Sequence, residues 1–252
     1  MRYALQWLRS VLFIGQMYVA MLVIGVLYLP YALWHRDGAL RACQDYCRYV
    51  RWSAKWMVGL RSEVRGEIPS GGVLIAAKHQ SFLDIIMIFG ALPRGRFIMK
   101  KQLVWAPILG WYGLRIGCVP VDRGKRGQAI KAMTARVKSG ALQEGQLIIY
   151  PQGTRVAPGV KKPYKVGTAV LYQELAQDCV PVATNVGMFW PRHSLYRKPG
   201  LAVVEFLPPI PAGREPRAFL AELEEVVEAA SDRLMAEAAA QLTPRRAAPG
   251  GK

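Results

Sequence analysis

Residues 72–90 read GVLIAAKHQSFLDIIMIFG and combine three kinds of segment in one short stretch. The apolar run at 72–77 predicts a buried strand, and the apolar residues at 82–90 predict a helix. Polar residues separate them, among them His79, and Asp84 falls in the first turn of the helix. A strand, a short polar turn and a helix form the repeating unit of an α/β domain, so this stretch indicates the fold class.

The same alternation continues through the body of the chain. Together these segments predict an α/β domain with a mixed sheet flanked by helices. The other predicted strands are 96–99, 116–121, 146–150, 180–186 and 202–206, and the other predicted helices are 126–140, 164–176 and a terminal helix at 215–240.

The N-terminal part of the chain has a different pattern. No charged residue occurs from 10 to 34, and a helix of 25 residues would reach about 37 Å, enough for a hydrocarbon core of about 30 Å. Pro30 is expected to end or kink this helix near Leu29. A second, basic amphipathic helix follows at 36–57, of a kind suited either to an anionic membrane interface or to packing on the domain.

We therefore divide the chain into three parts. Residues 1–60 form a membrane-anchoring helical segment, residues 61–240 the α/β domain, and residues 241–252 a disordered tail. Basic residues close behind the apolar run favour a membrane orientation in which the α/β domain faces the cytoplasm. Whether the first helix spans the bilayer or dips into one leaflet stays open.

Composition narrows the classes of function. The 252 residues carry 34 Lys+Arg against 17 Asp+Glu, a net charge of +17, and 52% are hydrophobic. The apolar content excludes a disordered chain, and the charge indicates a polyanionic partner such as an anionic membrane surface or a phosphorylated substrate. Motifs of nucleic-acid binding are missing, so no nucleic acid is expected. Four scattered cysteines predict no disulfide framework and a reducing compartment.

His79 and Asp84 are the strongest candidates for catalysis. The turn between strand and helix lets the Asp84 carboxylate bend back toward the imidazole, fix its tautomer and leave the other nitrogen as a general base. A structural alternative is an S-x-x-D capping box, in which the Ser81 side chain caps the helix and the Asp84 carboxylate accepts the backbone N–H of Ser81 in return. A serine or cysteine nucleophile lacks an activating motif, and three scattered histidines offer no metal site.

Cations follow three further predicted strands, on the side where open α/β sheets bind ligands. Gly153 would let backbone amides approach an oxyanion, and Arg155 beside it offers a bidentate grip. A solvated surface position is the alternative for any one of these cations. The candidate substrate-binding residues are Lys100, Lys101, Arg123, Gly153, Thr154 and Arg155.

KHQSFLD, CVPVDRG, YPQGTR and CVPVATNVG, in this order across residues 78–187, resemble the four blocks of the glycerolipid acyltransferase family. More narrowly, the chain resembles the bacterial 1-acyl-sn-glycerol-3-phosphate acyltransferases. The resemblance implies transfer of a fatty acyl group from acyl-CoA or acyl-carrier protein to the sn-2 hydroxyl of lysophosphatidic acid. The product would be phosphatidic acid, in phospholipid biosynthesis, and no cofactor or metal is implied beyond the acyl donor.

By this resemblance His79 is the general base, Asp84 orients it, and Arg123 and Arg155 hold the acceptor phosphate. Two positions depart from the family blocks. Lys78 stands where the family usually has asparagine, and Gln152 stands where it usually has glutamate. Glutamine keeps the hydrogen-bonding capacity of that position but loses its charge.

Two other functions stay open at this point. The first is an acyltransferase with another acceptor, such as glycerol-3-phosphate or another lysolipid. The second is a non-catalytic, membrane-anchored binder of anionic lipid that uses the positive charge alone.

Overall fold

The computed structural model describes residues 2–121, 135 and 145–242. Within these ranges one sheet has the strand order β1-β7-β6-β2-β5-β3-β4. The strands are β1 (Leu60–Arg65), β2 (Val73–Ala77), β3 (Gly95–Lys100), β4 (Val119–Val121), β5 (Gln146–Ile149), β6 (Cys179–Thr184) and β7 (Gly200–Phe206).

Most of the sheet is parallel, with one reversal. Strand β2 pairs in parallel with β5 and β6, and β3 pairs in parallel with β5 and β4. Strand β7 runs antiparallel to β6 and parallel to β1. The prediction of a mixed sheet flanked by helices is therefore confirmed. Since β2, β3, β4 and β5 run the same way, the C-terminal ends of these strands lie along one edge of the sheet.

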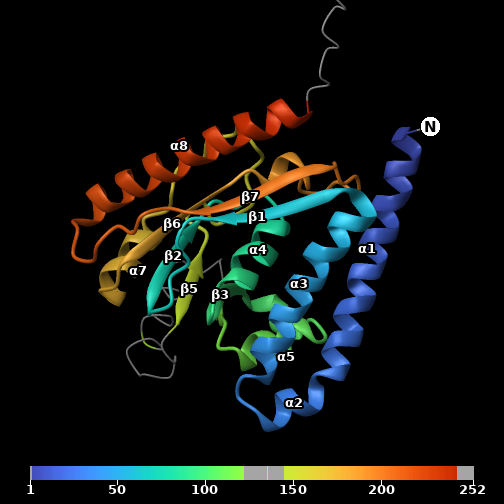
Figure 1. Ribbon diagram of the computed structural model, residues 1–252. Helices are drawn as coiled ribbons and strands as arrows, with labels where there is room; N and C mark the ends of the chain where they lie inside the picture. The colour runs from blue at the N-terminus through green and yellow to red at the C-terminus, as the bar shows by residue number, and fades with distance from the viewer. Residues whose placement is uncertain (1, 122–134, 136–144, 243–252) are drawn as a thin grey trace, which may run out of the picture.

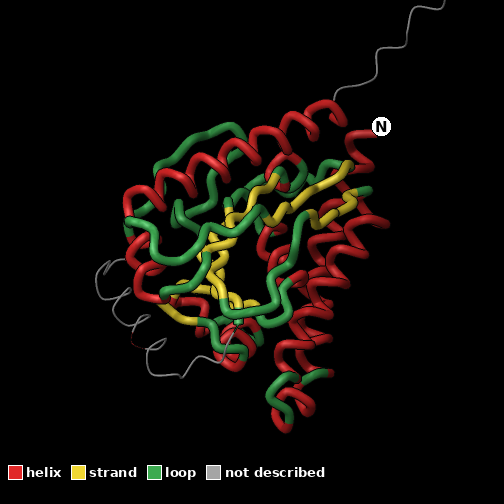
Figure 2. The backbone as a smooth tube through the Cα atoms, turned by 60° about the vertical axis from the view of Figure 1, so that its left-hand side comes forward, coloured by secondary structure: helices red, strands yellow, loops and turns green. Residues whose placement is uncertain are grey.

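Helices cover both faces of this sheet (Figure 1). On one face Ile75 belongs to a core that includes Met87 of α4 (Leu83–Ala91). On the other face Leu74 belongs to a core that includes Leu223 and Val227 of α8 (Pro216–Leu242). Helix α7 (Gly167–Leu175) lies on the α8 side, and Figure 2 shows the strands between the two helical layers.

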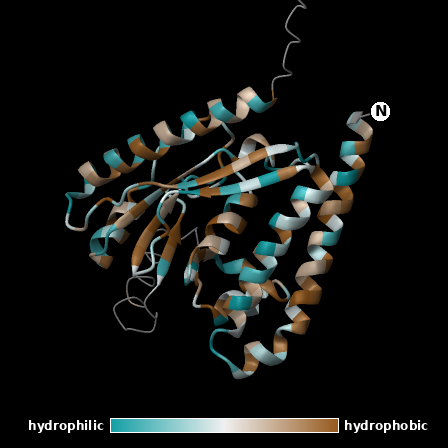
Figure 3. Ribbon diagram, viewed as in Figure 1, coloured by the Kyte–Doolittle hydropathy of each residue, from teal (hydrophilic) through white to brown (hydrophobic). Residues whose placement is uncertain are grey.

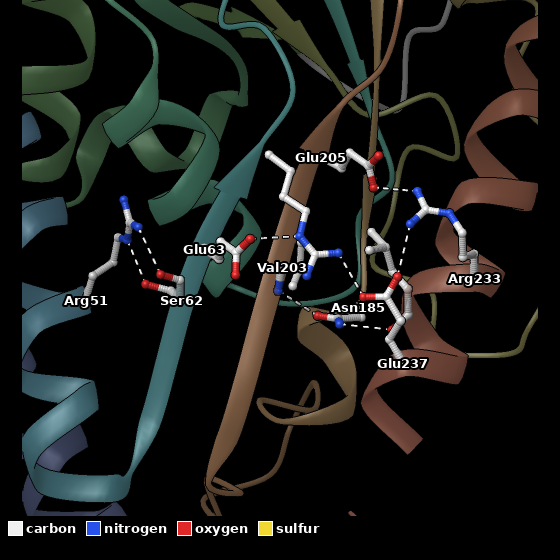
Figure 4. Close-up of polar contacts among 10 residues, drawn as sticks. Arg51, Ser62, Glu63, Asn185, Val203, Glu205, Arg233 and Glu237 are labelled. Atoms are coloured by element: carbon white, nitrogen blue, oxygen red, sulfur yellow. Dashed lines mark hydrogen bonds and ion pairs between the residues drawn. The ribbon is translucent and has the colours of Figure 1, made fainter. Parts of the chain in front are cut away.

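Polar contacts fix the C-terminal half of α8 on the sheet (Figure 4). Arg65 of β1 contacts Glu237 at 2.8 Å, and Arg233 contacts Glu205 of β7 at 2.6 Å. Asn185, just after β6, donates a hydrogen bond to a backbone carbonyl of α8. Helix α8 is therefore held to three different parts of the sheet region.

The N-terminal helices stand beside the sheet. Helix α1 (Arg2–Leu27) ends two residues before α2 (Leu29–Trp34) begins, so the prediction of a break near Pro30 is confirmed. Within the described residues α1 is the one helix that passes the length and hydropathy test for a membrane span, over Tyr3–Leu27. Its apolar character is visible in Figure 3.

Helix α3 (Gly38–Val58) is amphipathic as predicted, but its apolar face is not free. Cys47, Val50 and Ala54 are buried in the core that also contains Phe13 of α1. The interpretation that this apolar face lies in a membrane interface is therefore wrong, because α1, α4 and β1 cover it. The exposed basic side of the helix remains available to solvent.

Several predicted boundaries change in the structure. Strand β1 was not predicted, because LRSEVR alternates polar and apolar residues at the edge of the sheet. Residues 116–118 follow α5 (Leu109–Arg115) and are not strand, so the predicted strand at 116–121 shrinks to β4. A short 3-10 helix, η1 (Lys101–Trp105), precedes α5, and another, η2 (Val186–Met188), follows β6.

The predicted helix at 126–140, apart from residue 135, and most of the predicted tail lie outside the described residues. The three-part division of the chain stays a prediction.

Candidate active site

His79 and Asp84 form a hydrogen-bonded pair in the turn between β2 and α4. His79 Nδ1 lies 2.8 Å from Asp84 Oδ1, and the Asp84 side chain is fully buried. The His79 side chain keeps 11% of its surface exposed, and Nε2 has no hydrogen-bond partner among the described residues. The carboxylate therefore fixes a tautomer with the proton on Nδ1, and it leaves Nε2 as an acceptor.

The same carboxylate also organises the turn. Asp84 Oδ2 accepts hydrogen bonds from the backbone N–H groups of Gln80, at 2.8 Å, and Ser81, at 2.7 Å. Ser81 Oγ in turn accepts a hydrogen bond from the Leu83 N–H at 3.2 Å. The sequence offered helix capping and base orientation as alternatives for Asp84. In the structure Asp84 does both, because Oδ1 orients His79 and Oδ2 accepts the backbone N–H groups of the turn.

An aromatic side chain that the sequence analysis did not select packs on the imidazole. The Tyr150 ring stacks on His79 with 3.9 Å between centroids and 18° between planes. Burial, followed by the nearby Asp84 carboxylate, raises the pKa of Tyr150 well above its ordinary value. Tyr150 directly follows β5, which pairs with β2. This place at the end of a strand next to β2 is the feature that could have predicted Tyr150 as a site residue.

The turn at 151–155 lies against the His79 turn. The Val156 N–H donates to the His79 carbonyl at 2.7 Å, and β5 pairs directly with β2. Gly153 has φ +69°, and a Cβ there would lie 2.3 Å from Lys165 Nζ. The positive φ favours glycine at this position, and Lys165, whose exposed side chain lies against Gly153, is a further cation at this turn. Thr154 and Arg155 are partly exposed beside it.

The remaining candidates are placed differently. Lys100 ends β3 and Lys101 begins η1, and both side chains are exposed. Strand β3 is separated from β2 by β5. These lysines therefore lie on the same edge of the sheet as His79, but one strand farther from it than the turn at 151–155 does. Arg123 lies outside the described residues.

Other reactive groups in the described chain are poorly suited to chemistry. All four cysteines are free thiols, and burial raises the pKa of Cys118 to about 11 and that of Cys43 to about 12. Such thiols are protonated at neutral pH and are weak nucleophiles. No group of three or more His, Cys, Asp or Glu side chains in these residues is arranged to hold a metal ion.

Comparison with known proteins defines the class. A family model described as Acyltransferase matches residues 61–185. A 1-acyl-sn-glycerol-3-phosphate acyltransferase of Pseudomonas aeruginosa is 30% identical over 238 residues, which cover 92% of each protein. The human 1-acyl-sn-glycerol-3-phosphate acyltransferase alpha is 31% identical over 163 residues, which cover 62% of this chain and 57% of the human protein.

A solved structure has the same fold. The crystal structure of the 1-acyl-sn-glycerophosphate acyltransferase PlsC from Thermotoga maritima superposes with a TM-score of 0.79 at 20% identity, over 94% of this chain and all of that chain. Fold, family model and relatives together define an acyltransferase enzyme. The chain belongs to the 1-acyl-sn-glycerol-3-phosphate acyltransferase family.

Proposed function

We propose that this enzyme transfers a fatty acyl group from acyl-CoA or acyl-carrier protein to the sn-2 hydroxyl of lysophosphatidic acid, forming phosphatidic acid. The similarity to 1-acyl-sn-glycerol-3-phosphate acyltransferases supports this acceptor. The observation that carries the proposal is the His79–Asp84 pair at 2.8 Å, with Nε2 free of any partner in the described residues. An imidazole held in this way is built to remove a proton from a hydroxyl.

The reaction needs no covalent enzyme intermediate. A thioester is already electrophilic, so the enzyme must position the alcohol and take up its proton. His79 Nε2 accepts the hydroxyl proton while the hydroxyl oxygen forms an ester bond to the acyl carbon. The carbon–sulfur bond breaks, and the proton passes from His79 to the departing thiolate. Asp84 stabilises the imidazolium that exists between these two steps.

The acceptor phosphate is assigned to the turn at 151–155. Arg155 offers a bidentate grip, and Gly153 allows close approach of backbone N–H groups. Thr154 adds a hydroxyl, and the exposed Lys165 ammonium beside Gly153 adds a second charge. Lys100 and Lys101 are assigned to the same phosphate from farther along the sheet edge. Arg123, which lies outside the described residues, is assigned to it by the resemblance to the family blocks alone.

Helix α1 is assigned to the membrane that holds the lipid acceptor. Gln6 donates hydrogen bonds to the backbone carbonyls of Val58 and Arg197, so one face of α1 is fixed to the domain. Its other face exposes large apolar side chains, among them Leu12 at 55% and Leu22 at 56%. We assign this face to the hydrocarbon of the bacterial inner membrane, with the domain in the cytoplasm and the exposed basic side of α3 near anionic headgroups.

The test is acyl transfer to lysophosphatidic acid by purified protein in vesicles. Wild type, His79→Ala and His193→Asn are compared with labelled acyl-CoA and then with acyl-carrier protein. His193 is exposed and has φ +61°, which asparagine tolerates, so this variant is the matched control. Phosphatidic acid from wild type and His193→Asn, with a loss of at least about 100-fold in His79→Ala, is expected.

Three outcomes would contradict the proposal. Full activity of His79→Ala would remove the general base. Faster transfer to glycerol-3-phosphate or a neutral lysolipid would change the acceptor. If wild type transfers no acyl group from either donor to any acceptor and still binds anionic vesicles, the result would favour a non-catalytic lipid binder.

A further inference from the structure

A buried ion pair lies directly behind the His79 turn, on the opposite face of the sheet. The Lys78 side chain is only 2% exposed, and its ammonium contacts both carboxylate oxygens of Glu228, at 2.5 and 2.6 Å. Glu228 lies on α8, 150 residues farther along the chain, and its side chain is 14% exposed. The residue next to the proposed base is therefore bonded to the C-terminal helix.

The same carboxylate reaches the second turn of the site. Glu228 Oε1 accepts a hydrogen bond from the Tyr164 hydroxyl at 3.1 Å and from Gln152 Nε2 at 3.4 Å. Gln152 is 1% exposed and directly precedes Gly153. One side chain of α8 thus contacts the residue before His79 and the residue before the proposed phosphate-binding glycine.

Glu228 cannot touch the reacting atoms from this position. Lys78 continues the alternation of β2 on the α8 face, where Leu74 lies in the same core as Val227, whereas His79 packs on Tyr150. Any effect must pass through the main chain. The Lys78 N–H is bonded to β6, and the His79 carbonyl accepts the Val156 N–H, so both turns are rigidly connected.

We propose that Glu228 is a positioning residue of the acyltransferase site, whose carboxylate holds the His79 turn through Lys78 and the Gly153 turn through Gln152. This inference rests on the proposed function. Lys78 and Gln152 are also the two positions at which the sequence departs from the family blocks. The chain supplies a lysine and a neutral amide there, and α8 supplies the negative charge. Because Leu223 and Val227 of α8 are buried in the core against the sheet, the helix can support both turns.

The first arm of the test compares Glu228→Gln with Glu225→Gln. Glu225 is an exposed glutamate on the same helix and is the charge-matched control. We expect Glu228→Gln to lower kcat about 10-fold to 100-fold, as small displacements of a catalytic group do, and Glu225→Gln to retain wild-type kcat. A folded Glu228→Gln protein with wild-type kcat and KM would overturn the proposal.

The second arm moves the carboxylate. In the Glu228→Gln background, Gln152→Glu restores a carboxylate beside Lys78, because Gln152 Nε2 lies 3.4 Å from the Glu228 oxygen that the Lys78 ammonium also contacts, and kcat should recover. In the wild-type background the same Gln152→Glu change puts two carboxylates beside one ammonium, and kcat should fall. If Gln152→Glu lowers kcat in both backgrounds, the proposal is overturned. A merely structural role predicts that the substitution changes kcat in the same direction in both.

A third arm removes the effect of stability. Glu228→Gln leaves the Lys78 charge buried without a counter-ion, which destabilises a fold, whereas Lys78→Met with Glu228→Leu removes both charges. We expect this double variant to melt near the wild-type temperature and still lose kcat about 10-fold or more. Wild-type kcat in this folded variant would also contradict the proposal.

The last arm does not depend on activity. The chain has three histidines, so the imidazole nitrogen NMR signals of His79 can be assigned by comparison with His79→Gln. Glu228→Gln should shift the His79 signals, and Glu225→Gln should leave them in place. If wild type transfers no acyl group but this shift is seen, the proposed function fails while the positioning role stands. An unchanged His79 signal in Glu228→Gln overturns the positioning role itself.

Discussion

Two neighbouring residues, Lys78 and His79, each pair with a carboxylate, on opposite faces of one sheet, and the pairs differ in kind. His79 pairs with Asp84, five residues away in the same strand–turn–helix unit. Lys78 pairs with Glu228 on a helix 150 residues away. The first pair joins residues of one local unit, whereas the second joins two distant segments of the domain.

The two carboxylates, Asp84 and Glu228, also differ in the hydrogen-bond partners that surround them. Asp84 uses one oxygen for His79 and the other for backbone N–H groups, and His79 Nε2 keeps no partner among the described residues. Glu228 is surrounded by side-chain donors, namely Lys78, Tyr164 and Gln152. A pair with one unused acceptor is suited to chemistry, and a pair with none is suited to holding structure.

The largest effect is expected from breaking the local pair. Asp84→Asn keeps the shape of the side chain but removes the charge that fixes the His79 tautomer. We expect kcat for acyl transfer to fall about 10³-fold to 10⁴-fold with the fold retained. The measurement is kcat beside a thermal melt, and a kcat within tenfold of wild type would show that the pair only shapes the turn.

Ser81→Ala is the control for that variant, because it removes the acceptor for the Leu83 N–H and leaves the His79–Asp84 pair intact. Stability should fall by about 1 kcal/mol, the usual cost of a lost helix-start hydrogen bond, and kcat should not change. Abolished turnover in a folded Ser81→Ala protein would instead indicate a serine nucleophile.

The next largest effect is on stability and concerns the distant pair. Lys78→Met leaves the Glu228 carboxylate buried without its cation, and we expect unfolding to require about 3–5 kcal/mol less free energy. Arg233→Ala breaks the contact with Glu205 in Figure 4, but Arg233 is 50% exposed, so its loss should cost less than about 1 kcal/mol. Denaturant unfolding of the two variants in the same detergent checks the order, and equal losses would contradict it.

The difference between the pairs also explains how much could be predicted from sequence. The alternation of apolar runs predicted the α/β sheet, and the five-residue spacing within one turn predicted the contact of His79 with Asp84. Both inferences use only neighbours in the chain. The short edge strand β1 was missed because polar residues on an exposed edge weaken the apolar pattern.

Contacts between distant segments were beyond such reasoning. Glu228 looked like one of several acids on a solvated terminal helix, and nothing local indicates that it faces Lys78. Tyr150 was read only as the end of a strand, because its stacking on His79 depends on β5 lying beside β2. Strand order is decided by long-range packing, which a single sequence does not state.

Tyr150 offers a smaller test of the local site. Tyr150→Phe keeps the ring on His79 and should leave kcat unchanged. Since burial and the Asp84 carboxylate raise the pKa of Tyr150 well above its ordinary value, the hydroxyl stays protonated at neutral pH, and the pH–rate profile should also be unchanged. Tyr150→Leu loses the stacking and should cost about tenfold in kcat. A displaced profile in Tyr150→Phe would mean that the hydroxyl takes part in proton transfer.

The smallest effect is expected where α8 begins, far from both pairs. Glu215 accepts hydrogen bonds from the backbone N–H groups of Arg217 and Ala218, each at 2.9 Å, and these bonds lower the pKa of its carboxyl group. A carboxyl pKa that is lower in the folded state stabilises the fold above the unfolded pKa, and this contribution disappears as the pH falls through the folded pKa. Glu215→Gln should therefore melt slightly below wild type at neutral pH, and the two melting temperatures should converge in acid. A difference that persists in acid would assign the effect to the shape of the cap rather than to its charge. In that case the support that α8 gives to Glu228 would not depend on the pH of the assay.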